Sequence, residues 1–145
     1  MKKRIFNLLM AVMITAGLQA QKAGNAPVLA YDANRSLTWE EAIAFYRDLD
    51  ARYEEATLLE MGMTDAGQPL HLFLISSDGE SDPAMIHKQG KAIVLINNGI
   101  HPGEPEGIDA SARFAADLLA NVDGMKKYLR NCSVAIIPVY NIGGA

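Results

Sequence analysis

Two apolar segments with one amphipathic segment between them constrain the fold of this chain most strongly. Residues 92–97 and 133–140 are apolar at nearly every position, which is typical of strands covered on both faces. Between them, apolar residues recur at three- and four-residue intervals and predict a helix from Pro105 to about Asn121, with Pro105 in its first turn. Strand, helix and strand in this order predict parallel neighbours joined by a right-handed crossover, and hence an α/β fold.

A helix and a hairpin are predicted ahead of this unit. Residues 36–53 carry Thr38 and Glu41 at capping-box spacing, and their apolar residues follow helical intervals. Two further apolar segments, 56–64 and 69–77, flank the turn-forming residues DAGQ. This arrangement predicts two antiparallel strands joined by a tight connection.

The remaining segments complete the predicted architecture. Residues 78–90 are polar and predict a loop, and residues 123–130 predict a shorter helix. We expect a mixed, mostly parallel central sheet flanked by helices, with residues 92–97 forming a central strand.

The N-terminal residues have the three-part layout of a secretory signal. A basic cluster at positions 2–4 precedes an apolar run of 14 residues and then small and polar residues. This run is shorter than the roughly 20 residues that a membrane-spanning helix needs. We therefore predict a signal peptide over residues 1–20, cleaved near Ala20, a linker or extended lead-in over residues 21–35, and a domain over residues 36–145. The protein is expected to be secreted or periplasmic, without a stable membrane anchor after cleavage.

Charge and cysteine content exclude some partners and bonds. Removing the signal takes away three basic residues and no acidic ones, which leaves 10 basic and 17 acidic residues. Nucleic acid is therefore not an expected partner, because phosphate binding needs a positive patch. Cys132 is the only cysteine, so no disulfide can form within the chain, and we expect it to be a small buried hydrophobe.

A histidine and a glutamate lie three residues apart just after the first apolar strand, in the sequence NNGIHPGEPEG. Gly99 and Gly103 allow the backbone to turn sharply, and Pro102 limits its flexibility. We therefore expect a stiff loop at the carboxyl end of the strand, where open α/β sheets bind ligands. Imidazole nitrogen and carboxylate oxygen are good zinc ligands. His101 and Glu104 are thus candidate zinc ligands.

The spacing alone leaves other assignments open. A histidine after a strand can cap backbone groups, and the helix macrodipole favours a carboxylate near a helix start whether or not it binds metal. Glu106, inside the predicted first turn, is assigned to this dipole effect. His71 alternates with Leu70 and Leu72 and is expected at the surface or the sheet edge, and His87 is expected in the polar loop. Neither is expected to bind the metal.

The stretch NNGIHPGEPEG resembles the first zinc-binding motif of the carboxypeptidase A-like zinc metallocarboxypeptidases. The segments TWEEAIAFYRDLDARY and MGMTDAGQPLHLFLIS resemble the opening helix and the glycine-proline hairpin of that family, and CSVAIIPVYNIGGA resembles the strand that leads to its Asn-Pro-Asp-Gly segment. The resemblance covers residues 37–145. The sequence NIGG departs from Asn-Pro-Asp-Gly, which implies a subgroup with a different local backbone.

The resemblance implies a zinc site and a peptidase activity. In that family, two histidines and one glutamate hold one zinc ion, with a water in the fourth position. His101 and Glu104 would be two of these ligands. The third ligand, the arginines that bind the substrate carboxylate and the general base would lie beyond Ala145. The implied reaction is hydrolysis of the C-terminal peptide bond of a peptide or protein by a zinc-activated water.

This chain would then be the N-terminal part of the catalytic domain, truncated at its C-terminal end and inactive by itself. Two alternatives remain from the sequence. Related proteins with the same motif act as deacylases on small amides or as amidases on cell-wall peptides. The chain would otherwise be a non-catalytic exported remnant or binding domain. Neither the substrate preference nor the oligomeric state follows from these residues.

Overall fold

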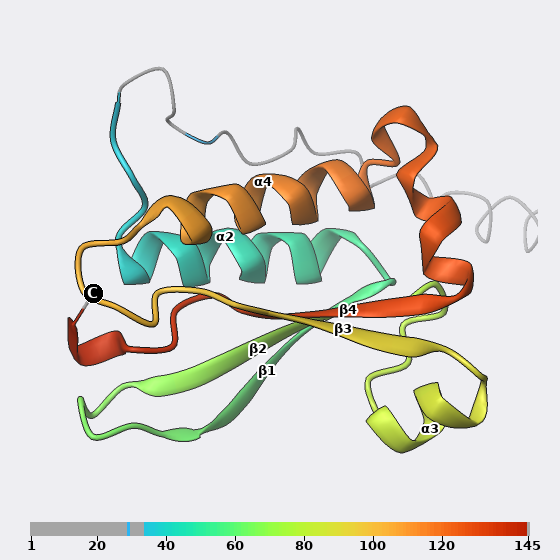
Figure 1. Ribbon diagram of the computed structural model, residues 1–145, viewed down its shortest axis with the longest axis horizontal. Helices are drawn as coiled ribbons and strands as arrows, with labels where there is room; N and C mark the ends of the chain where they lie inside the picture. The colour runs from blue at the N-terminus through green and yellow to red at the C-terminus, as the bar shows by residue number, and fades with distance from the viewer. Residues whose placement is uncertain (1–28, 30–33, 145) are drawn as a thin grey trace, which may run out of the picture.

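The computed structural model describes residue 29 and residues 34–144. The predicted signal peptide over residues 1–20 and most of the predicted linker over 21–35 lie outside the described residues. The described chain forms a four-stranded sheet with helices on both faces (Figure 1). Its strands are β1 (Ala56–Met63), β2 (Pro69–Ile75), β3 (Ala92–Asn97) and β4 (Cys132–Ile137).

The sheet is mixed, with the strand order β1-β2-β4-β3. β1 and β2 form the predicted antiparallel hairpin, and β3 and β4 are the predicted parallel neighbours. The prediction of a mixed α/β sheet flanked by helices is therefore confirmed. Among the described strands, however, only the β3–β4 pairing is parallel, because β2 joins the other side of β4 in antiparallel orientation.

The prediction that residues 92–97 form a central strand is wrong for the described chain. β4 lies between β2 and β3, so β3 forms one edge of the four-stranded sheet. Val94 is about half exposed and Leu95 is 60% exposed. An unbroken apolar sequence indicates that both faces of a strand are apolar, but it does not say how many neighbouring strands there are.

Two helices cover one face of the sheet and pack side by side above it (Figure 1). They are α2 (Trp39–Arg52) and α4 (Glu106–Leu119). Side chains from both helices and from the sheet form the main core, which includes Tyr46, Leu49, Phe73, Ala115 and Ile136. Burial of each leucine or phenylalanine side chain stabilises the folded chain by roughly 1.5–3 kcal/mol.

The predicted starts of these helices are close to the observed ones. At α2, the Glu41 amide donates to Thr38 Oγ1 (3.3 Å) and the Thr38 amide donates to Glu41 Oε2 (3.0 Å), which confirms the capping box. α4 begins at Glu106, so Pro105 occupies the N-cap rather than the first turn. No helix of the described chain is both long and apolar enough to cross a membrane.

The segment predicted as a loop, residues 78–90, contains a short helix, α3 (Pro83–Lys88). Asp82 Oδ1 accepts a hydrogen bond from the Ala84 amide (2.8 Å), and Pro83 has the backbone angle that a first helical residue needs. Ile86 is buried against the sheet face opposite α2 and α4. The helix is too short for a sequence period to reveal it. The predicted helix over 123–130 is present in part, as the 3₁₀ helix η2 (Val122–Arg130), because Asp123 (φ +50°) and Gly124 (φ +72°) interrupt it with left-handed backbone conformations.

Cys132 begins β4 and is a free, partly exposed thiol. The expectation of a buried cysteine is therefore not met, because this residue lies at the strand's end. A second 3₁₀ helix, η3 (Ile142–Gly144), follows β4.

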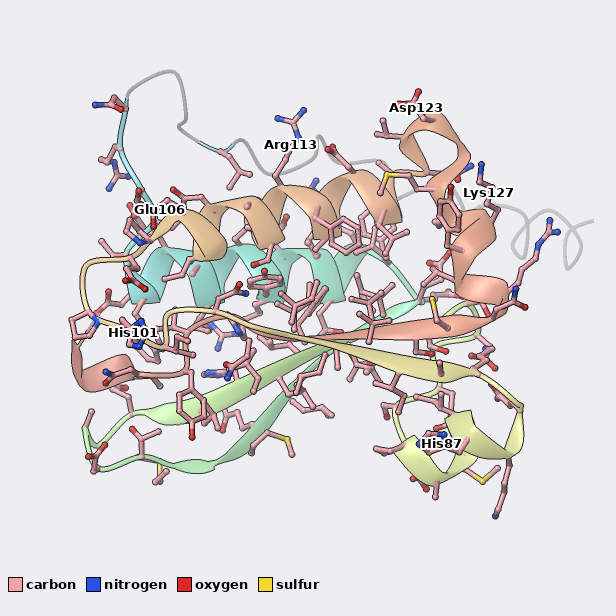
Figure 2. All side chains as sticks on the ribbon, viewed as in Figure 1. His87, His101, Glu106, Arg113, Asp123 and Lys127 are labelled. Carbon is pink, nitrogen blue, oxygen red and sulfur yellow. The ribbon has the colours of Figure 1, made fainter. Side chains whose placement is uncertain are left out.

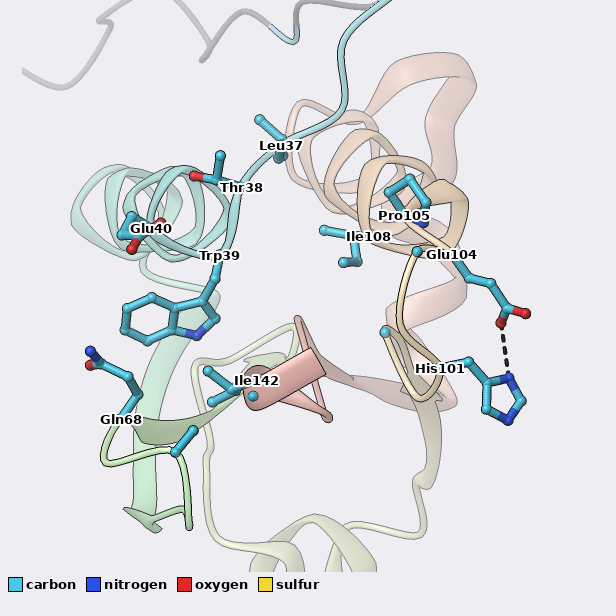
Figure 3. Close-up of a pocket in the computed structure, with 14 residues that line it drawn as sticks. Leu37, Thr38, Trp39, Glu40, Gln68, His101, Glu104, Pro105, Ile108 and Ile142 are labelled. Carbon is cyan, nitrogen blue, oxygen red and sulfur yellow. Dashed lines mark hydrogen bonds and ion pairs between the residues drawn. The ribbon is translucent and has the colours of Figure 1, made fainter. Parts of the chain in front are cut away.

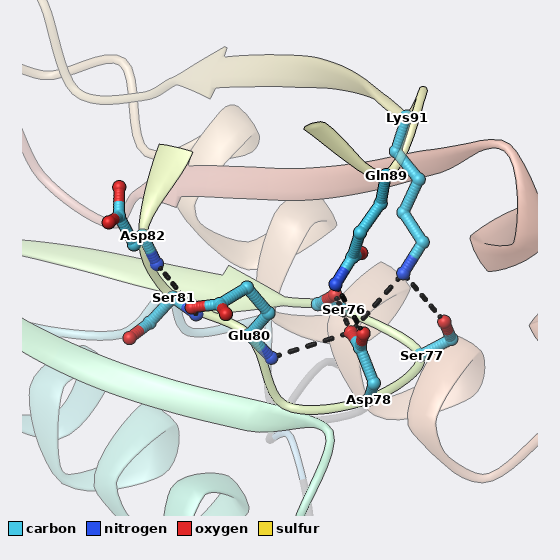
Figure 4. A network of polar contacts seen from close by, with 8 residues as sticks. All are labelled: Ser76, Ser77, Asp78, Glu80, Ser81, Asp82, Gln89 and Lys91. Atoms are coloured by element: carbon cyan, nitrogen blue, oxygen red, sulfur yellow. Dashed lines mark hydrogen bonds and ion pairs between the residues drawn. The ribbon is translucent and has the colours of Figure 1, made fainter. Parts of the chain in front are cut away.

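A network of polar side chains ties the end of β2 to the start of β3 (Figure 4). The carboxylate of Asp78 accepts hydrogen bonds from Ser76 Oγ (2.6 Å), Gln89 Nε2 (2.8 Å) and Lys91 Nζ (3.2 Å). The Ser76 hydroxyl, followed by Lys91 and Gln89, holds the pKa of Asp78 well below its usual range. The network thus fixes the connection that carries α3.

We expect Asp78→Asn to destabilise the chain by about 1 kcal/mol at pH 7, because the buried Lys91 ammonium loses its carboxylate partner. The pKa of Asp78 is lower in the folded chain than in the unfolded chain. This stabilisation is therefore fully present above about pH 4 and is lost as the pH falls through the folded value. Urea unfolding of the wild type and the variant between pH 7 and pH 2 measures both effects.

The control for Asp78→Asn is Asp117→Asn, which removes an exposed pair with Arg113 on α4. We expect this control to cost no more than about 0.5 kcal/mol. Equal losses in the two variants, or a loss for Asp78→Asn that persists unchanged near pH 2, would contradict the assignment.

The open edge of β3 generates a second prediction. A flat apolar edge with unpaired backbone groups is a template for strand addition. We expect the 145-residue chain, expressed alone, to self-associate, and Leu95→Lys to reduce this association. Val122→Lys replaces an exposed apolar residue that lies on η2, outside the edge strand, and should leave it unchanged. Sedimentation velocity measures the association, and a wild-type monomer at all concentrations would refute the prediction.

Candidate metal-binding site

The loop that leaves β3 and enters α4 makes the sharp turns that its glycines predict. Gly99 has φ +58° and Gly103 has φ +75°, which are left-handed conformations that favour glycine. At Gly99 a Cβ atom would also lie 3.1 Å from Val139 Cγ1, so the loop passes close to the chain after β4. These constraints place His101 and Glu104 just beyond the carboxyl end of β3.

His101 and Glu104 lie next to each other in space. His101 Nδ1 is 2.9 Å from Glu104 Oε2, within hydrogen-bond distance (Figure 3). Both side chains are well exposed, at 67% for His101 and 61% for Glu104. Sequence spacing and structure thus agree that one short loop presents an imidazole nitrogen and a carboxylate oxygen at the same point on the surface.

The two facing atoms fit part of a zinc site. Zinc binds nitrogen and oxygen at about 2.0–2.2 Å in tetrahedral sites, which separates two ligands by about 3.3–3.5 Å. The observed separation of 2.9 Å needs to open by only a few tenths of an ångström. Among the described residues, however, no group of three or more histidine, cysteine, aspartate or glutamate side chains could hold a metal ion. Metal binding by His101 and Glu104 therefore stays a prediction.

The start of α4 stabilises negative charge beside the pair. Glu106 is exposed in the first turn of α4, as its dipole assignment predicts. Asp109, in the same turn, is buried and accepts a hydrogen bond from the Leu37 amide (3.0 Å). This bond ties the chain ahead of α2 to α4. Sequence reasoning missed it, because a carboxylate in a first turn is expected at the surface.

A cavity of about 710 Å³ lies behind the loop, between the start of α2, the β1–β2 turn and η3. Its lining includes Trp39, Gln68, Ile108 and Ile142, together with the loop itself. The side chains of His101 and Glu104 point away from Trp39 and Gln68 (Figure 3). His101 and Glu104 nevertheless belong to the lining of the cavity.

The other two histidines lie elsewhere, as expected. His87 is exposed on α3 and lies at the opposite end of the molecule from His101 (Figure 2). His71 lies on β2 and shares no metal-binding group with His101 among the described residues. Neither histidine completes the site.

The prediction that His71 lies at the surface or the sheet edge is wrong. Its side chain alternates with Leu70 and Leu72 as predicted, but it is only 2% exposed. The ring of Trp39 on α2 lies over it, with ring centroids 6.2 Å apart. Alternation correctly separated the two faces of β2, but it did not reveal that α2 covers the face of His71.

Burial lowers the pKa of His71, and the positive charge of Arg47 adds to this effect. The Glu60 carboxylate and the Pro69 carbonyl oppose it. Glu60 Oε1 is 3.8 Å from Nε2, too far for a hydrogen bond, and neither ring nitrogen has a well-formed hydrogen bond to a described residue. At neutral pH the imidazole of His71 is therefore uncharged in the folded chain.

Comparison with protein families decides the family of this chain. The family model for zinc carboxypeptidases, peptidase family M14, matches residues 42–145. The chain belongs to the zinc carboxypeptidase family. The matched region contains the hairpin, the loop with His101 and Glu104, and both apolar strands of the crossover. A search of curated proteins finds no match.

Solved carboxypeptidase structures share the fold. Carboxypeptidase A from Helicoverpa armigera is 20% identical with a TM-score of 0.66, and the match covers 94% of this chain and 31% of that one. Thrombin-activatable fibrinolysis inhibitor is 17% identical with a TM-score of 0.65, covering 86% of this chain and 31% of that one. A metallo-carboxypeptidase from Burkholderia cenocepacia is 20% identical with a TM-score of 0.60, covering 75% and 28%. This zinc carboxypeptidase chain spans about a third of the length of these structures.

The burial of His71 generates a pH prediction for this zinc carboxypeptidase chain. The pKa of His71 is lower in the folded chain than in the unfolded chain. The contribution of neutral His71 to stability is therefore fully present above about pH 6.5 and is lost as the pH falls below 6.5 toward the folded pKa. We expect His71→Leu to weaken this acid-induced loss, because leucine takes up no proton. Urea unfolding between pH 7.5 and pH 5 measures it.

His87→Leu is the matched control for His71→Leu, since it removes an exposed histidine from α3. We expect the pH dependence of the control to match that of the wild type. If His71→Leu also keeps the wild-type slope, burial of a neutral His71 does not contribute to the pH dependence.

Proposed function

We propose that this chain is the N-terminal part of an exported zinc-dependent metallocarboxypeptidase, with His101 and Glu104 as two of the zinc ligands. The observation that carries the proposal is the contact between His101 Nδ1 and Glu104 Oε2, at a strand-to-helix loop of a chain in the zinc carboxypeptidase family. The proposed reaction is release of the C-terminal residue from a peptide or protein.

The residues of this chain bind and orient the metal. His101 and Glu104 are ligands and not acid or base, because their facing atoms would both be used by the ion. The bound zinc would polarise the scissile carbonyl and lower the pKa of a water molecule. Gly99 and Gly103 set the turns of the loop, and α4 begins two residues after Glu104. The third ligand, the general base and the groups that bind the substrate carboxylate are proposed to lie outside these residues.

Three features support the proposal that the chain is part of a longer catalytic domain. Its pair of ligands leaves most of the coordination sphere to water, and two protein ligands are too few for tight binding. No described strand pairs with the outer edge of the apolar strand β3, where Leu95 is exposed. The chain also spans only 31% of the length of the Helicoverpa armigera carboxypeptidase A structure.

A peptide or protein substrate agrees with the family. One solved relative, bovine thrombin-activatable fibrinolysis inhibitor, is described in complex with tick carboxypeptidase inhibitor. The proposal of export depends on the sequence pattern of residues 1–20 alone, which lie outside the described residues.

Glu104→Gln in the full-length protein tests the proposed ligand. We expect zinc affinity to fall about 100-fold or more, because an amide replaces a charged carboxylate ligand. Peptidase activity should fall with it at limiting zinc. Zinc content after dialysis and competition with a chelator measure the affinity, and release of the C-terminal residue from a peptide measures the activity.

Glu106→Gln is the matched control, since it removes an exposed carboxylate two residues away in the first turn of α4. It should leave zinc affinity unchanged. Unchanged zinc stoichiometry and affinity in Glu104→Gln would contradict the role of Glu104, and the same result in His101→Ala would remove the proposed site altogether.

A further inference from the structure

We propose that Asn98 is a positioning residue that fixes where the loop carrying His101 and Glu104 leaves the sheet. The inference builds on the proposed function of that pair. Asn98 directly follows β3, three residues before His101, and is buried. Its side-chain amide donates hydrogen bonds from Nδ2 to Ser111 Oγ on α4 (2.8 Å) and to the Ile137 carbonyl on β4 (3.2 Å).

The side-chain contacts of Asn98 continue into both covering helices. Ser111 donates to the Ile108 carbonyl (3.2 Å), and its oxygen lies 3.0 Å from the hydroxyl of Tyr46 on α2. With its own proton used on Ile108, Ser111 Oγ accepts from both Asn98 and Tyr46. Buried polar groups with all partners satisfied hold one arrangement, because any displacement leaves a group unpaired.

The backbone of Asn98 is fixed as well. Its amide donates to the Ile137 carbonyl (3.2 Å), and its carbonyl accepts from the Tyr140 amide (2.8 Å). The Gly99 carbonyl accepts from the Asn141 amide (2.9 Å). The next backbone hydrogen bond along the described chain joins the Asp109 amide to the Pro105 carbonyl (3.1 Å), beyond the loop. Asn98 and Gly99 are therefore the last anchored residues before the proposed ligands.

The first turn of α4 packs directly on the Asn98 side chain. A Cβ atom at Gly107 would lie only 2.9 Å from Asn98 Oδ1, so a larger residue there would displace the amide. The two anchors of the loop, the end of β3 and the start of α4, thus meet at this one side chain. An aspartate could not replace it, because a carboxylate would face the Ile137 carbonyl without a proton to donate.

Asn98→Ala and Tyr46→Phe in the full-length protein separate positioning from general stability. Asn98→Ala removes two side-chain hydrogen bonds from the buried network and Tyr46→Phe removes one, but only Asn98 lies at the start of the loop. We expect both variants to unfold at lower urea concentration. Only Asn98→Ala should weaken zinc binding, by about tenfold in a chelator competition, as is typical when support of a ligand is lost.

Hydrogen exchange of the metal-free proteins gives a second readout that does not depend on zinc. The amides of Asn98, Tyr140 and Asn141, which carry the backbone hydrogen bonds at the start of the loop, should exchange faster in Asn98→Ala than in the wild type, and at the wild-type rate in Tyr46→Phe. Zinc affinity within twofold of the wild type in Asn98→Ala, or an equal loss in Tyr46→Phe, would overturn the inference.

The two proposals fail in different ways. If the wild type binds no zinc through His101 and Glu104, the proposed function fails, while the metal-free exchange rates still decide the role of Asn98. If Asn98→Ala does not fold, Ser111→Ala removes the acceptor on α4 and leaves the Asn98 side chain in place. It should shift affinity and exchange in the same direction by a smaller factor, and no shift in either would overturn the inference.

Discussion

The parallel pairing of β3 with β4 through α4 is the constraint on which the rest of the structure depends. Because the two strands run in the same direction, their carboxyl ends lie next to each other at the same end of the sheet. This brings the backbone of Tyr140 and Asn141 beside Asn98 and Gly99. The first residues of the loop with His101 and Glu104 are therefore hydrogen-bonded to the chain after β4 and packed against the start of α4.

Features that depend on residues close together in the sequence could be predicted. The capping box of Thr38 and Glu41 and the turns at Gly99 and Gly103 depend only on residues close in sequence, and each is present. The closeness of His101 and Glu104 follows from their spacing in one short loop. Two of the features that sequence reasoning missed are set by residues distant in sequence. Leu95 is exposed because nothing described lies beyond β3, and His71 is buried because α2 crosses its face.

Buried polar groups have two different roles in this chain. Asn98 and Ser111 are hydrogen-bonded to each other and to further groups, and these bonds join four elements of the fold. His71 is buried without a well-formed partner and is held neutral by desolvation. The first arrangement specifies a geometry, and the second makes the stability depend on pH. Since neither pattern has a periodic sequence signal, only tertiary structure distinguishes them.

The two open features of the chain belong to the same strand. No described strand pairs with the outer edge of β3, and the loop at its carboxyl end presents the exposed side chains of His101 and Glu104. Under the proposed function, a strand that pairs with this edge would have one of its ends beside the loop, since paired strands run alongside each other about 4.8 Å apart. Completing the sheet and completing the metal site would then be one event. A chain that covers β3 with its own later residues would bring new side chains within reach of His101 and Glu104.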